Sequence, residues 1–218
     1  MKFSKGVKRS MNTRPYRLGR RKESSEQTRQ RILTAARDLL ASSRGLSAFT
    51  IDAVAKQASV ARMTVYHQFG SKSGLLEALC DTLAARGGIQ QMGNVYREAN
   101  PLAAMDRFFA VFAGFWDSDR LVIRRLNSLG ALDPVLERVL RGRADRRRQH
   151  ASALVGRLTE TLGRPTLESF HEAVAILHTL SSFETFDCLA GAKRSPLAVV
   201  SLVQRLARAA LGLSEKDS

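Results

Sequence analysis

The sequence has little of several features that define particular protein classes. Its 218 residues include two cysteines, Cys80 and Cys188, which are too few for a disulfide scaffold and suit a reducing compartment. The longest charge-free apolar stretch, around residues 173–183, is far shorter than the roughly 20 residues that a membrane-spanning helix needs. No apolar segment follows the Arg20-Arg21 pair, so an export signal is not indicated. These absences predict a cytoplasmic protein without a membrane partner.

Acidic residues are also scarce. The chain has 20 Asp and Glu against 35 Lys and Arg, a net charge of +15, which predicts a polyanionic partner. Residues 1–23 hold nine basic residues and one acidic residue, so they carry +8 of this excess. A charge block without hydrophobic periodicity is typical of disorder, and residues 1–23 are predicted to be a disordered basic arm. Whether this arm contacts DNA or is only a solvated tail stays open.

The rest of the chain has the periodicity of helices. Hydrophobic residues make up 44% of the sequence, and they recur at helical spacing rather than in alternation. Ser24 and Gln27 fit a capping box that would start the first helix. Pro101, Pro134 and Pro196 each follow a capping residue, the arrangement expected at a helix start. The fold predicted is all-α with about nine helices, the last five near 101–117, 120–130, 134–162, 166–191 and 196–212.

Residues 46–76 carry the strongest functional signal. Two short helices, at 50–58 and 61–68, flank a tight turn at Ser59-Val60 and predict a helix-turn-helix, whose second helix can enter the major groove. Ala61 and Val65 are expected to pack inward. The opposite face combines a forked donor, a hydroxyl and small contact groups that suit base edges and phosphates, carried by Arg62, Met63, Thr64, Tyr66 and His67. Thr50 and Ser71 lie at helix N-termini, where a phosphate is favoured, with Lys72 beside Ser71.

This segment resembles a known family. The string from Phe49 to Lys72 looks like the DNA-binding domain of TetR-type (TetR/AcrR) transcriptional regulators. Its distinctive part is Thr64-x-Tyr66-x-x-Phe69, followed by Ser71-Lys72-x-x-Leu75-Leu76. The resemblance covers about residues 25–86, and the remainder fits the family in length and helix count. One departure is Ser59, where the family has glycine, the residue that adopts a left-handed turn most cheaply.

The resemblance implies a function and a set of roles. Such proteins are helix-turn-helix regulators, usually homodimers on near-palindromic operators in double-stranded DNA and often repressors that a small molecule releases. Arg62, Met63 and Thr64 would contact bases or nearby backbone. Phosphates would be held mainly by the remaining matching positions, Thr50, Tyr66, His67 and Lys72, with Ser71 at the neighbouring N-terminus. The domains expected are the arm at 1–23, a DNA-binding domain at 24–86 with its motif near 50–69, and a ligand-binding and dimerisation domain at 87–218.

The C-terminal region offers an effector pocket and a dimer interface. Aromatic residues at helical spacing can form either a core or the wall of a pocket, and the resemblance favours a pocket for an apolar or aromatic effector. The pocket residues predicted are Phe108, Phe112, Phe115, Trp116, His178, Phe183 and Phe186. Two apolar stripes would form either a dimer interface or a core within one subunit; as an interface they comprise Val174, Leu177, Ser181, Val199, Leu202, Val203 and Leu206. The arginine run at 141–148 is expected to be a solvated helix face.

The sequence offers little for catalysis. It has no phosphate-binding glycine loop, no nucleophile elbow and no zinc-protease or CxxC motif, so no catalytic residue, metal site or cofactor is predicted. A metal or acid–base site could be built only from His171, His178, Glu184 and Asp187. Two alternatives to the ligand-responsive regulator stay open. One is a ligand-independent nucleic-acid-binding protein that uses the basic arm, and the other is a helical metal-dependent enzyme.

Overall fold

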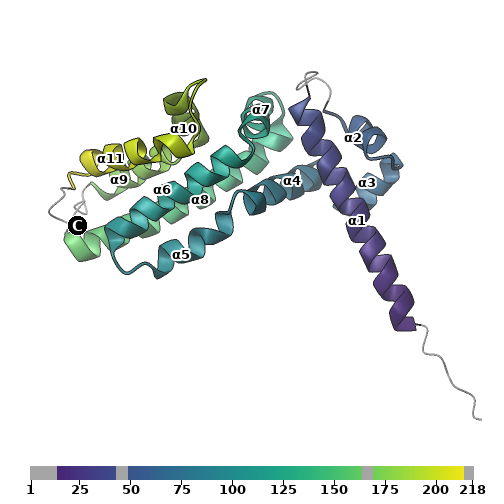
Figure 1. The fold of residues 1–218 in the computed structure, drawn as a ribbon, viewed down its shortest axis with the longest axis horizontal. Coiled ribbons are helices and arrows are strands. Elements are labelled where there is room, and N and C mark those ends of the chain that lie inside the picture. Colours follow the sequence, from purple (N-terminus) through teal and green to yellow (C-terminus); the bar gives the residue numbers. More distant parts are fainter. Residues whose placement is uncertain (1–13, 43–48, 164–168, 214–218) are drawn as a thin grey trace, which may run out of the picture.

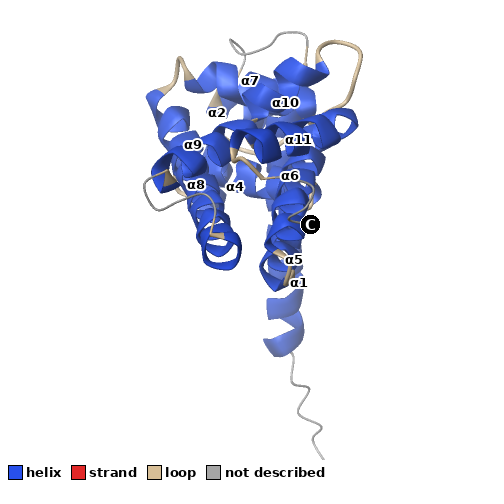
Figure 2. Ribbon diagram, turned by 90° about the vertical axis from the view of Figure 1, so that its left-hand side faces the viewer, coloured by secondary structure: helices blue, strands red, loops and turns tan. Residues whose placement is uncertain are grey.

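The computed structural model describes residues 14–42, 49–163 and 169–213, with side chains from residue 23 onward. These residues are mainly helical and contain no strand, which confirms the all-α prediction (Figure 2). They form eleven α-helices. In chain order these are α1 (Arg14–Ala41), α2 (Ile51–Gln57), α3 (Arg62–Phe69), α4 (Lys72–Arg86), α5 (Met92–Arg97), α6 (Pro101–Ser118), α7 (Arg120–Gly130), α8 (Pro134–Leu162), α9 (Phe170–Leu180), α10 (Phe183–Ala190) and α11 (Val200–Ala210).

Several helices differ from the prediction. Helix α1 starts at Arg14, so Ser24 lies inside it and residues 14–23 are helical rather than disordered. Pro15 stands in its first turn, where a missing N–H breaks no helical bond. Residues 1–13 of the predicted arm lie outside the described residues. The helix expected over 166–191 is divided into α9 and α10, because the Ser182 hydroxyl accepts a hydrogen bond from the Thr185 N–H at 3.2 Å and caps a new helix. Helix α5 is short and was not predicted.

Helices α1 to α4 form one end of the molecule (Figure 1). Their core contains Ile32 and Leu40 of α1, Val54 of α2 and Leu76 of α4, each fully buried. Val65 is the buried contact of α3. The same core includes side chains from α7 and α8, namely Val122, Leu126, Leu136 and Val139. Helix α4 ends at residue 86, where the domain boundary was predicted, but the N-terminal helices share their core with α7 and α8.

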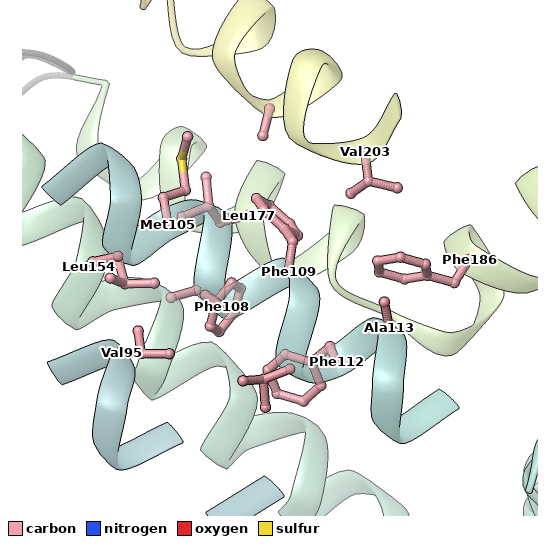
Figure 3. Packing of buried hydrophobic residues seen from close by; sticks show 14 of the residues in the cluster. Val95, Met105, Phe108, Phe109, Phe112, Ala113, Leu154, Leu177, Phe186 and Val203 are labelled. Carbon is pink, nitrogen blue, oxygen red and sulfur yellow. The ribbon is translucent and has the colours of Figure 1, made fainter. Parts of the chain in front are cut away.

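A second core fills the bundle of α6, α8, α9, α10 and α11. Phe108, Phe109 and Phe112 of α6 lie at its centre, with Leu177 of α9 and Val203 of α11 around them (Figure 3). The Phe108 ring makes edge-on contacts with Phe109 and Phe112, at centroid distances of 5.4 and 5.0 Å. Burying each such ring contributes about 1.5–3 kcal/mol. None of the described helices is both long and apolar enough to cross a membrane.

The turn between α2 and α3 has the backbone that the sequence predicted. Ser59 has a φ of 53°, and it is the single non-glycine residue with a positive φ in the described ranges. The left-handed region costs an L-residue about 1–2 kcal/mol, whereas glycine adopts it freely at a smaller cost in entropy.

Ser59→Gly is therefore expected to raise the free energy of unfolding by about 0.5–1 kcal/mol, as measured by urea denaturation. Ser152→Gly, inside α8, is the matched control and is expected to lower it, because a helical backbone gains nothing from glycine. A Ser59→Gly protein less stable than the parent would contradict the expectation.

Candidate nucleic-acid interface and effector cavity

The N-termini of α2 and α4 are capped as predicted. Thr50 Oγ1 accepts a hydrogen bond from the Ala53 N–H at 3.1 Å, and Ser71 Oγ accepts one from the Gly74 N–H at 3.0 Å. Gly74 allows α4 to begin directly over the end of α3, since a Cβ there would lie 2.1 Å from the Phe69 carbonyl oxygen. The two capped N-termini thus flank α3 in the sequence.

Helix α3 turns one side to the core and the other to solvent. Val65 is buried and Tyr66 packs partly against the same core, so these two residues fix the orientation of the helix. Ala61 is exposed, which corrects the expectation that it packs inward. The reason is that Ala61 is the cap residue with extended backbone, so a helical-wheel argument does not extend to it.

The predicted contact residues lie on the outer side of α3. Arg62, Met63 and His67 are exposed, and Met63 has 63% of its surface free. Thr64 and Tyr66 are half-buried at the flanks. A large apolar side chain so fully exposed, among donors and hydroxyls, is the composition expected of a surface that another molecule covers.

Arg62 is held across the helix-turn-helix. Its guanidinium pairs with the Asp52 carboxylate of α2 at 3.0 Å, and its Nη2 donates to the Tyr66 hydroxyl at 3.4 Å. The Tyr66 hydroxyl and the charge of Asp52 raise the pKa of Arg62 above its ordinary value. Asp52 and the Tyr66 hydroxyl are both accessible, so they orient the guanidinium of Arg62 without removing it from solvent.

Two residues of α1 that were not predicted as functional, Arg29 and Ser25, hold α3 in place. Arg29 of α1 donates to the Gln68 carbonyl oxygen at 3.0 Å, and its guanidinium lies 4.4 Å from the centroid of the Phe69 ring. Gln68 Nε2 donates to Ser25 Oγ at 3.0 Å. No local spacing signals either pair, because the partners are about 40 positions apart in the chain.

Lys72 has a partner in the second part of the molecule. Its ammonium group pairs with the carboxylate of Asp133, the residue that caps α8. The Lys72 hydrogen bond, together with the backbone N–H groups of Leu136 and Val135, lowers the pKa of Asp133. Lys72, predicted to hold a phosphate, therefore also connects the start of α4 with the start of α8.

A cavity of about 380 Å³ lies between α4, α6, α7, α8 and α10. Three of the predicted pocket residues line it, namely Phe115, Trp116 and Phe183. Phe108 and Phe112 of α6 and Phe186 of α10 do not line it and belong to the second core. His178 lies outside the lining and contacts Arg147, which does line it. The other lining residues include Cys80, Leu83, Ile123 and Leu126.

The predicted interface stripes are mostly internal. Val174, Leu177, Ser181, Val199 and Val203 are buried within the single chain, as the alternative of a core within one subunit requires. Ser181 is buried, and its carbonyl oxygen accepts a hydrogen bond from Trp116 Nε1 at 3.0 Å. Leu202 is half-buried and Leu206 is exposed, so these two remain available.

The residues considered for a metal or acid–base site do not converge. Asp187 is bound by Arg120 and Arg124, while Glu184 lies at the cavity and His178 faces Arg147. Among the described residues, no group of three or more His, Cys, Asp or Glu side chains is placed to hold a metal ion.

Comparison with known proteins identifies the N-terminal helices. Residues 32–79 match the model of the bacterial regulatory proteins of the tetR family. In this segment the chain is therefore similar to TetR-family regulators. This is a family of transcriptional regulators rather than enzymes. The chain is 34% identical over 110 residues to the HTH-type transcriptional regulator AlkX of Mycobacterium tuberculosis, covering 48% of this chain and 50% of the relative. The match thus spans half the length of that curated relative.

Solved structures extend the likeness of the fold to most of this chain. NalD, the secondary repressor of the MexAB-OprM multidrug efflux pump of Pseudomonas aeruginosa, has a TM-score of 0.66 at 21% identity, over 86% of this chain and 97% of that one. FadR of Bacillus subtilis, solved with stearoyl-CoA, has a TM-score of 0.59 at 16% identity, over 82% and 96%. At these identities the two structures show the shared fold alone.

Proposed function

We propose that this chain is a sequence-specific DNA-binding transcriptional regulator, a repressor that a small-molecule effector releases from its operator. The observation that carries the proposal is the outer face of α3. Arg62, Met63 and His67 are exposed there, while Val65 and the Arg29 contacts hold the helix in place. A helix whose inner face is packed against the core and whose outer face is exposed can enter the major groove.

The contacts are proposed residue by residue. Arg62, Met63 and Thr64 read base edges or adjacent backbone, and Tyr66 and His67 lie at the flanks near phosphates. Thr50 and Ser71, at the N-termini of α2 and α4, meet phosphates with their backbone N–H groups, and Lys72 adds a charge there. On this proposal, residues 24–86 are the DNA-binding domain and residues 87–218 bind ligand and a second subunit.

Helix α4 supports a route from effector to DNA. Its first residue, Lys72, stands beside the end of α3, and its Cys80 and Leu83 line the cavity. A molecule that fills the cavity presses on the helix that supports α3. The apolar and aromatic lining, with Phe115, Trp116 and Phe183, favours an apolar or aromatic effector. FadR of Bacillus subtilis, which shares this fold, was solved with stearoyl-CoA.

The regulator is proposed to act as a homodimer on an inverted repeat, because a two-fold protein matches a two-fold site. Leu202 and Leu206 of α11 are the predicted interface residues that remain accessible, and they form our proposed dimer contact. As a bacterial regulator of transcription it would work in the cytoplasm, where the chromosome lies.

Selection of bound DNA from a random pool, at physiological salt, tests the proposal. Enrichment of one inverted repeat would support a dimeric regulator and supply its operator. Retention of DNA without sequence preference would contradict it and favour the ligand-independent alternative, in which the basic N-terminal residues dominate. No retention at all would overturn the DNA-binding role.

Deletion of residues 1–22 tests the N-terminal basic residues. Nine Lys and Arg lie in this segment, and each phosphate that they neutralise releases counterions. If the segment binds the DNA backbone or the minor groove, the deletion is expected to make the slope of log K against log salt less steep. The slope should change by about one unit for each phosphate that is no longer neutralised. Fluorescence anisotropy at several salt concentrations measures the slope. An unchanged slope would show that the segment is a solvated tail.

A further inference from the structure

Arg147 stands out among the residues that line the cavity. Its guanidinium carbon lies 6.0 Å from the centroid of the Phe112 ring and 5.8 Å from that of Trp116. None of the ion pairs found among the described residues involves Arg147, and its buried Nε has no hydrogen-bond partner there. Burial lowers the pKa of Arg147, against the opposing effect of the Glu184 charge. A guanidinium that lies near two aromatic rings and forms no ion pair within the described residues is available to bind an anion.

His178 does not satisfy this guanidinium. His178 Nε2 lies 3.3 Å from Arg147 Nη2 and 3.2 Å from the Ala144 carbonyl oxygen. A ring nitrogen that donates its proton to a carbonyl oxygen has no lone pair left to accept a bond from an arginine. Burial and the charge of Arg147 lower the pKa of His178, which keeps the ring neutral beside the cation. The imidazole thus supports the side chain of Arg147 without compensating its charge.

The neighbouring arginines Arg141 and Arg143, unlike Arg147, have carboxylate partners. Arg143 donates to the Asp81 carboxylate at 2.9 Å, and Arg141 pairs with Glu137 at 2.5 Å. The remaining acid on the cavity is Glu184, whose side chain is exposed and forms no ion pair within the described part of the chain. The expectation that the whole run at 141–148 is a solvated face is therefore wrong for Arg143 and Arg147, since α8 turns them toward α4 and the cavity.

We propose that the effector of this cavity is an amphipathic monocarboxylate, with its carboxylate on Arg147 and its apolar part against Leu83, Phe115 and Ile123. The inference deepens the proposed function and rests on it. It adds a charge to the apolar effector expected from the sequence. Arginine binds carboxylates through two parallel hydrogen bonds, which are strong where water is excluded.

Trp116 provides the measurement, because it is the only tryptophan in the chain and it lines the cavity. Its fluorescence is titrated, without DNA, with decanoate, decanol and decyltrimethylammonium, three probes with the same tail and different charge. Decanoate is expected to bind about tenfold more tightly than decanol, and the cation most weakly, because charge-assisted hydrogen bonds exceed neutral ones. Equal affinity for decanoate and decanol, or no response to any of the three, would overturn the proposal.

Substitutions of single cavity residues test whether Arg147 is responsible for the preference for decanoate over decanol. Arg147→Gln is expected to bind decanoate and decanol equally, whereas Arg141→Gln, whose parent arginine also lines the cavity but is paired with Glu137, keeps the preference. Should Arg147→Gln fail to fold, Glu184→Gln is the second test, expected to tighten decanoate about threefold by removing a like charge and to leave decanol unchanged. Unaltered decanoate binding in the tested variant would contradict the assignment.

A separate assay with the selected operator keeps the two proposals apart. A protein that prefers decanoate but binds no operator would fail the proposed function and retain the anion site. A protein that binds its operator but does not distinguish the three probes would retain the function and lose the anion site.

Discussion

Replacing Arg62 with glutamine is expected to weaken binding to the selected operator about 10- to 100-fold, because one specific base contact is worth about 1–3 kcal/mol. Arg62 is exposed at the start of α3 and its fork is oriented by Asp52 and the Tyr66 hydroxyl. Fluorescence anisotropy with labelled operator measures the loss. Because a base contact carries the effect, affinity for a scrambled duplex should fall much less.

Arg107→Gln is the matched control for this substitution. The Arg107 side chain is 56% exposed and pairs with Glu98 at 2.7 Å, while the Arg62 side chain is 57% exposed and pairs with Asp52 at 3.0 Å. The two replacements remove the same charge and the same kind of ion pair, but Arg107 lies on α6, outside the proposed interface. Equal losses in both variants would show that net charge, and not the recognition helix, determines affinity.

Phe108→Ala is expected to lower the free energy of unfolding by about 3–5 kcal/mol, the usual cost of removing a buried aromatic ring. Phe108 is fully buried at the centre of the second core, in contact with Phe109 and Phe112 (Figure 3). Its neighbours come from several helices, so the cavity left by the ring cannot collapse through one local shift. Urea denaturation at several protein concentrations measures the change and accounts for any dimer.

Leu132→Ala is the control for the core substitution. Leu132 is 76% exposed between α7 and α8, and its truncation is expected to change stability by less than about 0.5 kcal/mol. The m-value should stay constant in both variants, which would show that each changes stability and not the unfolded state. A Phe108→Ala protein as stable as the parent would contradict the placement of this ring at the centre of the core.

The helix-turn-helix could be predicted because its signals are local. Thr50 and Ser71 each cap the helix that follows by accepting a hydrogen bond from an N–H only three residues later. Ser59 adopts the left-handed backbone that the turn of the motif requires. Where a local signal was misinterpreted, a competing local effect prevailed. Ser24 does not start a helix, because α1 begins ten residues earlier at Arg14. Ser182 starts a new helix inside the segment that was predicted to be one continuous helix.

The candidate cavity was only partly predictable. Aromatic residues spaced along α6 predicted an apolar cluster, but spacing does not say which side of the helix faces a cavity and which side faces a core. The same ambiguity affected the apolar stripes of α9 and α11. Val174 and Val203 have the spacing of an interface, and a helical stripe looks the same whether its partner is another helix of the chain or another subunit.

The amino-acid sequence by itself determined most of the helices, the caps of α2 and α4, the strained turn and the composition of the α3 face, because each depends on residues within one or two helical turns. Tertiary structure decided which faces are covered, where the cavity lies and which charges have partners. Lys72 pairs with Asp133, 61 positions away in the chain, and Arg147 lies near two aromatic rings with no ion pair to any residue that the structure describes. Such pairings depend on how helices pack against one another, and no spacing along the chain encodes the distance between residues on different helices.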